Sequence, residues 1–237
     1  MADFIEETQL VSERYARRQV GNRYSMLRPE VWLGMQERQR AILRLFQQDL
    51  HWQTMADKTL LEVGCGHGGN LLEFLRFGFL PENLSGSELL EERVKAARYS
   101  LPAATTIHEG DSIAADIAHN SQDIVFQSVV FSSLLDNNFQ QTLANQMWQW
   151  VKPGGGILWY DFIYNNPSNP DVRGVSIKRV KELFPSKHMI IKSVTLAPPI
   201  SRRVCKIHPN LYHLFNMTPW LRTHVLIWIA KPKVEAK

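Results

Sequence analysis

The sequence predicts one doubly wound α/β domain, a sheet of mostly parallel strands with helices on both faces, preceded by a helical cap. From residue 58 onward, apolar segments of strand length alternate with segments of helical periodicity. The first apolar segment runs into a glycine-rich turn at which a helix begins. The 237 residues, 44% of them hydrophobic, fit one sizeable core better than two.

The first fifty residues are expected to form helices that cap this domain. Residues 4–18 and 31–49 have helical periodicity, and in the second segment apolar side chains recur near one face. A linker that contains Gly, Asn and Pro, residues 20–29, separates the two helices. We therefore divide the chain into a helical cap or lid, residues 1–50, and an α/β domain, residues 51–237.

The alternation predicts seven strands in the domain, with helices between most of them. The expected strands are 58–63, 83–88, 103–108, 123–128, 157–163, 188–196 and 223–230. The expected helices are 68–77, 89–99, 138–150, 175–184 and 208–217. Gly78 ends the first of these helices, and Lys152-Pro-Gly-Gly-Gly156 is expected to break the chain before the fifth strand.

Charge is distributed unevenly along the chain. Residues 171–237 hold 13 Lys and Arg against 3 Asp and Glu, whereas the whole chain has a net charge of only +4. The basic C-terminal third is either solvated surface or a face that attracts an anionic acceptor, membrane headgroups or nucleic acid. No apolar stretch approaches the roughly 18 residues that a membrane helix needs, so any membrane contact is expected to be peripheral.

The two cysteines, Cys65 and Cys205, form neither a disulfide framework nor a metal-binding pattern. The acidic N-terminus also lacks the apolar region of a signal peptide. We therefore expect a cytoplasmic protein without a metal centre.

The segment Leu60-Leu-Glu-Val-Gly-Cys-Gly-His-Gly-Gly-Asn70 predicts a nucleotide site. A buried strand, a glycine turn and a helix start let a ligand approach the backbone and meet unpaired N–H groups. The glycines alone leave the nucleotide open, because Gly64, Gly66 and Gly69 also fit the dinucleotide pattern. Glu88, at the end of the second strand, is placed to accept both ribose hydroxyls of either ligand.

Three further features bear on whether the bound nucleotide is a dinucleotide or another adenine-containing ligand. The third strand ends in Glu109-Gly-Asp111-Ser112, where an acid can accept the exocyclic amine of an adenine. The glycine run after Lys152 precedes the fifth strand. The chain has no Tyr-x-x-x-Lys pair that a hydride-transfer enzyme could use as an acid, and it is short for a separate substrate domain.

These motifs, in this order and at strand ends, resemble the class I S-adenosylmethionine-dependent methyltransferases over about residues 58–165. The resemblance implies a Rossmann-like sheet with an antiparallel last strand and S-adenosylmethionine as cofactor. It implies that the glycine turn holds the methionine part, Glu88 the ribose, and the third strand end the adenine. The cofactor-binding residues expected on this basis are Glu62, Gly64, Cys65, Gly66, Gly68, Glu88, Leu89, Asp111, Ser112 and Gln127.

A looser resemblance links the chain to bacterial methyltransferases of polysaccharide and lipopolysaccharide gene sets. Its residues are Tyr15-Ala-Arg-Arg18, Arg23-Tyr-Ser25, Asn169-Pro-Asp-Val-Arg-Gly174, Leu196-Ala-Pro-Pro199 and Arg202-Arg203. Tyr15, Arg18, Tyr24 and Ser25 are candidates for a lid, or for a helix that merely packs on the sheet edge. O-methylation of a sugar or a small anionic metabolite is the expected activity.

Methyl transfer to a hydroxyl benefits from a base that takes the proton. Asp161, near the end of the fifth strand, and Asp136, after the fourth, are the catalytic candidates, although an ion pair and a helix cap are the alternative roles. Tyr24, Arg202 and Arg203 are the substrate-binding candidates, the two arginines lying on a connection between the sixth strand and the last helix. An apolar stripe from Leu211 to Leu221 is expected to pack in the core.

Two other functions remain open, a dinucleotide-dependent oxidoreductase and a non-catalytic nucleotide-binding module of a biosynthetic assembly. DNA amino-methylation is excluded, because Asn165-Asn-Pro167 follows the fifth strand and lacks the second proline of that motif. Cytosine-C5 chemistry is excluded because neither cysteine follows a proline. A nucleic-acid partner is not expected, and the sequence does not specify the oligomeric state.

Overall fold

Short apolar segments ending in polar or glycine residues form a seven-stranded sheet in the computed structural model, which describes residues 2–17, 21–167 and 169–233. The sheet order is β3-β2-β1-β4-β5-β7-β6. The strands are β1 (Leu60–Val63), β2 (Leu84–Glu88), β3 (Thr106–Glu109), β4 (Gln122–Ser128), β5 (Val151–Phe162), β6 (Met189–Leu196) and β7 (Arg222–Ala230). Strand β7 runs antiparallel to both of its neighbours and the remaining pairs are parallel, which confirms the predicted fold.

The run Lys152-Pro-Gly-Gly-Gly156 is not a break before β5, as expected, but lies inside it. Strand β5 begins at Val151, which pairs with Gln122, and the register shifts before Ile124 pairs with Gly156. A Cβ atom on Gly156 would lie 2.5 Å from the ring of Trp228. The glycine run therefore lets the neighbouring strand pack closely against β5.

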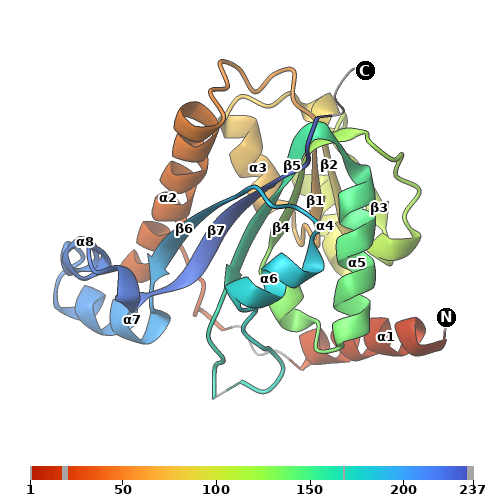
Figure 1. Ribbon diagram of the computed structural model, residues 1–237. Helices are drawn as coiled ribbons and strands as arrows, with labels where there is room; N and C mark the ends of the chain where they lie inside the picture. The colour runs from red at the N-terminus through yellow and green to blue at the C-terminus, as the bar shows by residue number, and fades with distance from the viewer. Residues whose placement is uncertain (1, 18–20, 168, 234–237) are drawn as a thin grey trace.

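Helices cover both faces of the sheet (Figure 1). One face packs against α2 (Pro29–Arg44), α3 (Gly69–Arg76) and α4 (Glu91–Ser100), and the other against α5 (Asn137–Trp150) and α6 (Ile177–Leu183). Successive residues of the central strands alternate between these two cores, as a strand covered on both faces requires.

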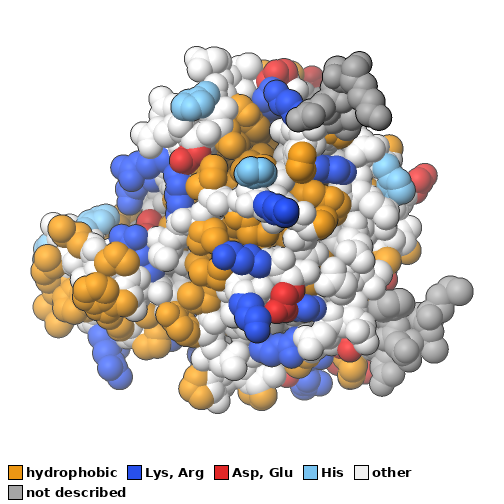
Figure 2. All heavy atoms as spheres, viewed as in Figure 1, with side chains coloured by type: hydrophobic (Ala, Val, Ile, Leu, Met, Phe, Trp, Pro, Cys, Tyr) orange, Lys and Arg blue, Asp and Glu red, His pale blue; other side chains and the backbone are white. Residues whose placement is uncertain are grey.

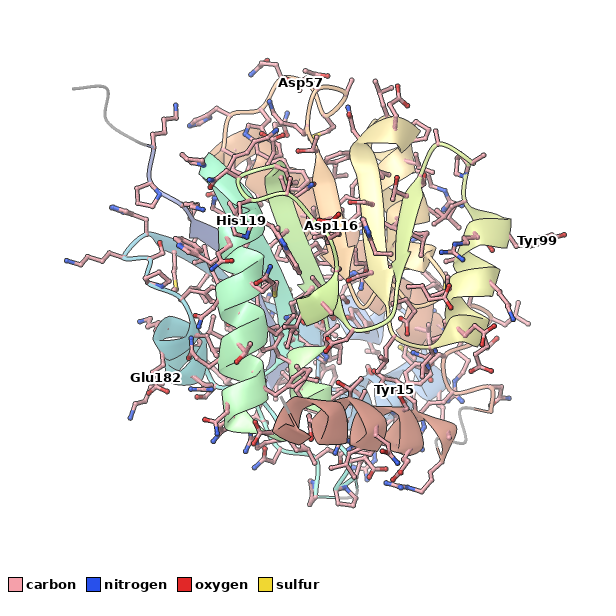
Figure 3. The ribbon with its side chains drawn as sticks, turned by 90° about the vertical axis from the view of Figure 1, so that its right-hand side faces the viewer. Tyr15, Asp57, Tyr99, Asp116, His119 and Glu182 are labelled. Atoms are coloured by element: carbon pink, nitrogen blue, oxygen red, sulfur yellow. The ribbon has the colours of Figure 1, made fainter. Side chains whose placement is uncertain are left out.

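Helix α1 (Ala2–Ala16) crosses the carboxyl ends of the strands. Figure 3 shows it, with Tyr15 labelled, at the opposite end of the molecule from Asp57, which precedes β1. The buried Arg14 donates to Glu7 (2.6 Å) and to the backbone oxygen of Ser133 (3.2 Å). Glu7 in turn accepts the N–H of Leu135 (3.0 Å), so the helix is tied to the segment after β4.

A helical lobe extends beyond β6, and part of it was not expected from the sequence. Residues Pro198–Ile207 form helix α7, where a connection was expected, and Leu211–Asn216 form α8. The predicted core packing of the stripe was wrong for several side chains. Figure 2 shows hydrophobic atoms gathered over this lobe, and the exposed ones are Leu214, Phe215, Met217 and Trp220.

No helix in the described part of the chain is long and apolar enough to cross a membrane.

Candidate cofactor site and its surroundings

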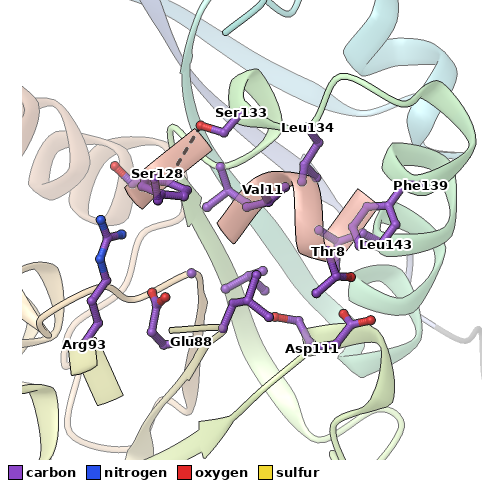
Figure 4. A pocket seen from close by; sticks show the side chains of 16 residues that line it. Thr8, Val11, Glu88, Arg93, Asp111, Ser128, Ser133, Leu134, Phe139 and Leu143 are labelled. Carbon is purple, nitrogen blue, oxygen red and sulfur yellow. Dashed lines mark hydrogen bonds between the residues drawn. The ribbon is translucent and has the colours of Figure 1, made fainter. Parts of the chain in front are cut away.

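A cavity of about 100 Å³ lies at the carboxyl edge of the sheet, where sites form in open α/β folds. Its walls come from the ends of β1, β2 and β4, from the segment after β3, and from α1. Figure 4 shows Thr8 and Val11 of α1 on one side and Glu88 and Asp111 on the other. The predicted residues Gly64, Leu89 and Ser112 also line it.

The glycine turn after β1 has a backbone conformation that residues with a side chain rarely adopt. Gly64, Gly66 and Gly68 have φ values of +67°, +57° and +82°. A Cβ atom on Gly64 would lie 2.6 Å from Val130 Cγ2, and one on Gly68 would lie 2.8 Å from Leu101 Cδ1. The turn therefore brings bare backbone to the cavity, as a bound ligand requires.

Glu88 organises the turn from the end of the neighbouring strand. Its Oε2 accepts the N–H of Gly66 (2.8 Å) and its Oε1 accepts the N–H of Leu90 (3.0 Å). The side chain is 5% exposed and lines the cavity. Each carboxylate oxygen has a second acceptor site, so Glu88 can still accept two ribose hydroxyls.

The end of β3 supplies the opposite wall. Asp111 accepts the N–H of Ile113 (2.9 Å) and so begins a short 3-10 helix. The hydroxyl of Ser112 lies 2.8 Å from that of Ser87 on β2. Asp111 and Ser112 line the cavity together with Leu89, where the adenine was expected.

Glu62 provides an independent test of whether S-adenosylmethionine fits. Its side chain is fully buried on β1, its Oε1 accepts from Asn70 (2.5 Å), and its Oε2 has no hydrogen-bond partner. Burial raises the pKa of Glu62 to about 8. An unpartnered acceptor beside a glycine turn suits the ammonium group of a bound amino acid, so the residues fit the cofactor.

Five of the predicted cofactor residues do not line the cavity, namely Glu62, Cys65, Gly66, Gly68 and Gln127. Gln127 is fully buried, and it caps the turn after β4 by accepting the N–H of Val130 (3.0 Å) and donating to the Tyr160 carbonyl (3.3 Å). Cys65 is buried, its N–H donates to the Ser87 carbonyl (2.9 Å), and burial raises the pKa of its thiol.

The two candidate bases are placed differently. Asp161 is fully buried, and its two oxygens accept the N–H groups of Ser132 (3.1 Å) and Phe162 (2.9 Å). Burial raises the pKa of Asp161 to about 7, although these hydrogen bonds oppose the shift. Asp136 is exposed and caps helix α5 by accepting the N–H of Phe139 (2.6 Å).

The substrate-binding candidates are not brought together. Arg202 and Arg203 lie on α7, beyond the far edge of the sheet from the cavity, and Tyr24 is 67% exposed. Arg18 lies outside the described residues. Tyr15 does reach the site, since its hydroxyl lies 3.4 Å from that of Ser133 and the Arg93 guanidinium lies 4.3 Å from its ring centroid.

The structure also shows a polar cluster that the sequence analysis did not find. Arg38 of α2 reaches Ser128, Asn70 and Glu73 and lies over the ring of Tyr160. These residues come from four separate elements, and only Asn70 belongs to a motif, at the end of the glycine-turn segment. Arg38 is one of several charged residues of α2, so nothing in the sequence indicated that it would reach this cluster.

Comparisons with known proteins agree with this site. Residues 60–155 match the model of the methyltransferase domain family. No curated protein matches the chain in sequence.

Three solved structures show that the fold is shared at low sequence identity. An S-adenosylmethionine-dependent methyltransferase from Methanosarcina mazei is 14% identical, with a TM-score of 0.55 over 79% of this chain and 98% of that one. Geranyl diphosphate C-methyltransferase from Streptomyces coelicolor is 14% identical, with a TM-score of 0.56 over 82% and 76%. Phosphoethanolamine N-methyltransferase 2 from Haemonchus contortus is 16% identical, with a TM-score of 0.57 over 83% and 52%.

The match to the methyltransferase domain family covers residues 60–155, and the solved methyltransferase structures share the class I fold, whose enzymes take their methyl group from S-adenosylmethionine. The segment that matches the family model includes the glycine turn, Glu88 and Asp111. Among the described residues, no group of three His, Cys, Asp or Glu side chains is placed to hold a metal ion.

Proposed function

We propose that the chain transfers a methyl group from S-adenosylmethionine to a hydroxyl oxygen of a sugar or another small anionic metabolite. The observation that carries this proposal is the cavity at the carboxyl edge, which Gly64 of the glycine turn, Glu88 and Asp111 line together. Two arginines lie outside the cavity at the same edge. The N–H of Arg173 donates to the Ser132 carbonyl (2.8 Å), beside the cavity-lining Ser133, and the Arg173 guanidinium reaches Asn137 (2.6 Å). Arg179 donates to the Asn137 carbonyl (2.9 Å), so two guanidinium groups lie at this edge.

An anionic acceptor also fits the charge of the chain. Residues 171–237 hold 13 Lys and Arg against 3 Asp and Glu, and such a surface attracts anions. Two structural relatives are named for phosphate-bearing acceptors, phosphoethanolamine and geranyl diphosphate. The buried free cysteines Cys65 and Cys205 suit a reducing compartment, and we place the protein in the cytoplasm.

The residues of the chain contribute alignment more than chemistry. Bound S-adenosylmethionine supplies a methyl carbon activated by its sulfonium. Glu62, Glu88, Asp111, Ser112 and the glycine turn hold and orient the cofactor. Fixing two reactants in attack geometry contributes on the order of 7–11 kcal/mol to the barrier reduction.

Helix α1 is proposed to be the lid of the cofactor site. The cavity beneath it, about 100 Å³, is smaller than the roughly 300–1,000 Å³ of ordinary ligand pockets, and a shift of α1 would enlarge it for the cofactor. We expect saturating S-adenosylhomocysteine to slow hydrogen exchange of the α1 amides and of the glycine turn, compared with the free chain. Unchanged exchange in α1, with protection of the turn, would make α1 a static part of the fold.

The proposed reaction is tested with S-adenosylmethionine and a panel of methyl hexosides, methyl hexuronosides and hexose 1-phosphates. Mass spectrometry measures S-adenosylhomocysteine and the methylated product. We expect at least one anionic member to be methylated, and Glu88→Ala to lower the rate at limiting cofactor. Cofactor binding without transfer to any member would support the non-catalytic module instead. Thermal protection by a nicotinamide dinucleotide alone would support the oxidoreductase.

A further inference from the structure

Two β-branched residues at the carboxyl edge have an unusual backbone. Val129, directly after β4, has φ +60°, and Thr195, on β6, has φ +64°. Such conformations cost about 1–3 kcal/mol each and persist where surrounding contacts impose them. The contacts here converge on one residue, because Val129 N–H donates to the Tyr160 carbonyl (2.9 Å) and the Tyr160 hydroxyl lies 2.8 Å from Thr195 Oγ1.

His224 lies against the ring that these contacts hold. Its imidazole stacks on Tyr160, with ring centroids 5.2 Å apart and an interplanar angle of 17°. Because β7 is antiparallel, its first residues reach the same edge as the ends of β4 and β5, and His224 pairs in register with Phe162. Nδ1 lies 3.1 Å from the Thr223 hydroxyl, and the side chain is only partly buried.

Arg38 connects His224 and Tyr160 to the cofactor cavity. Its guanidinium lies 5.2 Å from the Tyr160 ring centroid and donates to Ser128 Oγ (3.2 Å), a residue of the cavity wall. It also donates to Asn70 Oδ1 (2.7 Å), and Asn70 holds Glu62. The chain of contacts from Glu62 to His224 therefore spans the cofactor side and the side where β5 and β7 end.

We propose that His224 is the catalytic base, and that the acceptor hydroxyl is bound at the carboxyl edge between α2 and strands β5 and β7. This inference rests on the proposed function. The acceptor oxygen forms a bond to the methyl carbon while the carbon–sulfur bond breaks and leaves its electron pair on sulfur. The hydroxyl proton passes to His224 Nε2, and from there to solvent. Nδ1–H donates to Thr223 in the tautomer that leaves Nε2 free to accept.

The two bases expected from the sequence are already engaged. Both oxygens of Asp161 accept backbone N–H groups in the interior, and Asp136 caps α5. Burial and the neighbouring Arg38 charge lower the pKa of His224 to about 4. His224 is consequently neutral at physiological pH, the only state in which an imidazole accepts a proton, and it does not repel a sulfonium.

The position of His224 is tested on the full chain without any acceptor. Imidazole ¹H–¹⁵N spectra are recorded with S-adenosylhomocysteine and then with S-adenosylmethionine, which differ by one methyl group and one positive charge. We expect the ring signals of His224, assigned by their loss in His224→Asn, to shift between the two complexes. The signals of the exposed His213 on α8 are expected to stay unchanged.

Identical His224 signals in two complexes that calorimetry shows to be saturated would overturn the inference and leave the proposed methyltransferase intact. If neither ligand binds, the proposed function fails first. On an acceptor found with the panel, His224→Asn and His224→Gln should each lower kcat about 10²-fold or more while cofactor affinity stays within about twofold. His213→Asn is the matched control, and unchanged kcat in folded His224 variants would also overturn the assignment.

Discussion

Glu88→Ala is expected to weaken S-adenosylmethionine binding by about 10- to 100-fold, or roughly 1.4–2.8 kcal/mol. The carboxylate has two roles, because it fixes the N–H groups of Gly66 and Leu90 and faces the cavity with its remaining acceptor sites. Hydrogen bonds to a charged group contribute about 1.5–3 kcal/mol each, so their loss has an effect of this size. Isothermal titration calorimetry measures it directly.

Glu109→Ala is the matched control for this variant. Glu109 pairs in register with Glu88 at the end of the adjacent strand, but it is exposed and pairs with Arg98 (3.1 Å). We expect its removal to leave cofactor affinity within about twofold, as surface ion pairs contribute little. Equal affinities in the wild type and Glu88→Ala would contradict the assigned ribose-binding role.

The free energy of unfolding is expected to fall as the pH rises from about 4 to 8, by a few kcal/mol, although the lowered pKa of His224 opposes the fall below a pH of about 6.5. Burial raises the pKa of Glu62 to about 8 and that of Asp161 to about 7, above the usual 4.3 and 3.9 of unfolded chains. Between its unfolded and its folded pKa, each of these two carboxyl groups is protonated in the folded chain and ionised in the unfolded chain. Their contribution to the free energy of unfolding is therefore fully present below a pH of about 4 and is lost as the pH rises through about 7 to 8.

Urea denaturation of the ligand-free chain at several pH values measures this dependence. The double variant Glu62→Gln, Asp161→Asn should remove most of the slope, because neither amide ionises in this range. The exposed Glu109→Gln should retain the slope of the wild type. A wild-type slope of opposite sign between pH 5 and 8, unaffected by the double variant, would show that the two carboxyls are ionised in the folded chain.

The cofactor half of the molecule could be predicted because its signals are local. A buried strand, a positive-φ glycine turn and a helix follow one another within eleven residues, and parallel strands place Glu88 and Asp111 at the same edge. The sheet and most helix positions follow from the same periodicities.

The residues of the proposed acceptor site could not be predicted, since they meet only through long-range packing. Arg38, Tyr160, Thr195 and His224 lie on α2, β5, β6 and β7, and no spacing in the sequence links them. Helix α7 was missed because the residues between the sixth strand and the last helix were expected to form a connection, although proline, as at Pro198, is tolerated in the first turn of a helix. Asp161 was a reasonable base by position, but periodicity does not reveal that its oxygens face backbone N–H groups.

Calorimetric titration of the full chain with S-adenosylmethionine tests the cofactor assignment most directly. We predict saturable binding that S-adenosylhomocysteine competes for and that Glu88→Ala weakens about tenfold or more. No heat of binding from S-adenosylmethionine, together with saturable binding of a nicotinamide dinucleotide at the same turn, would contradict it.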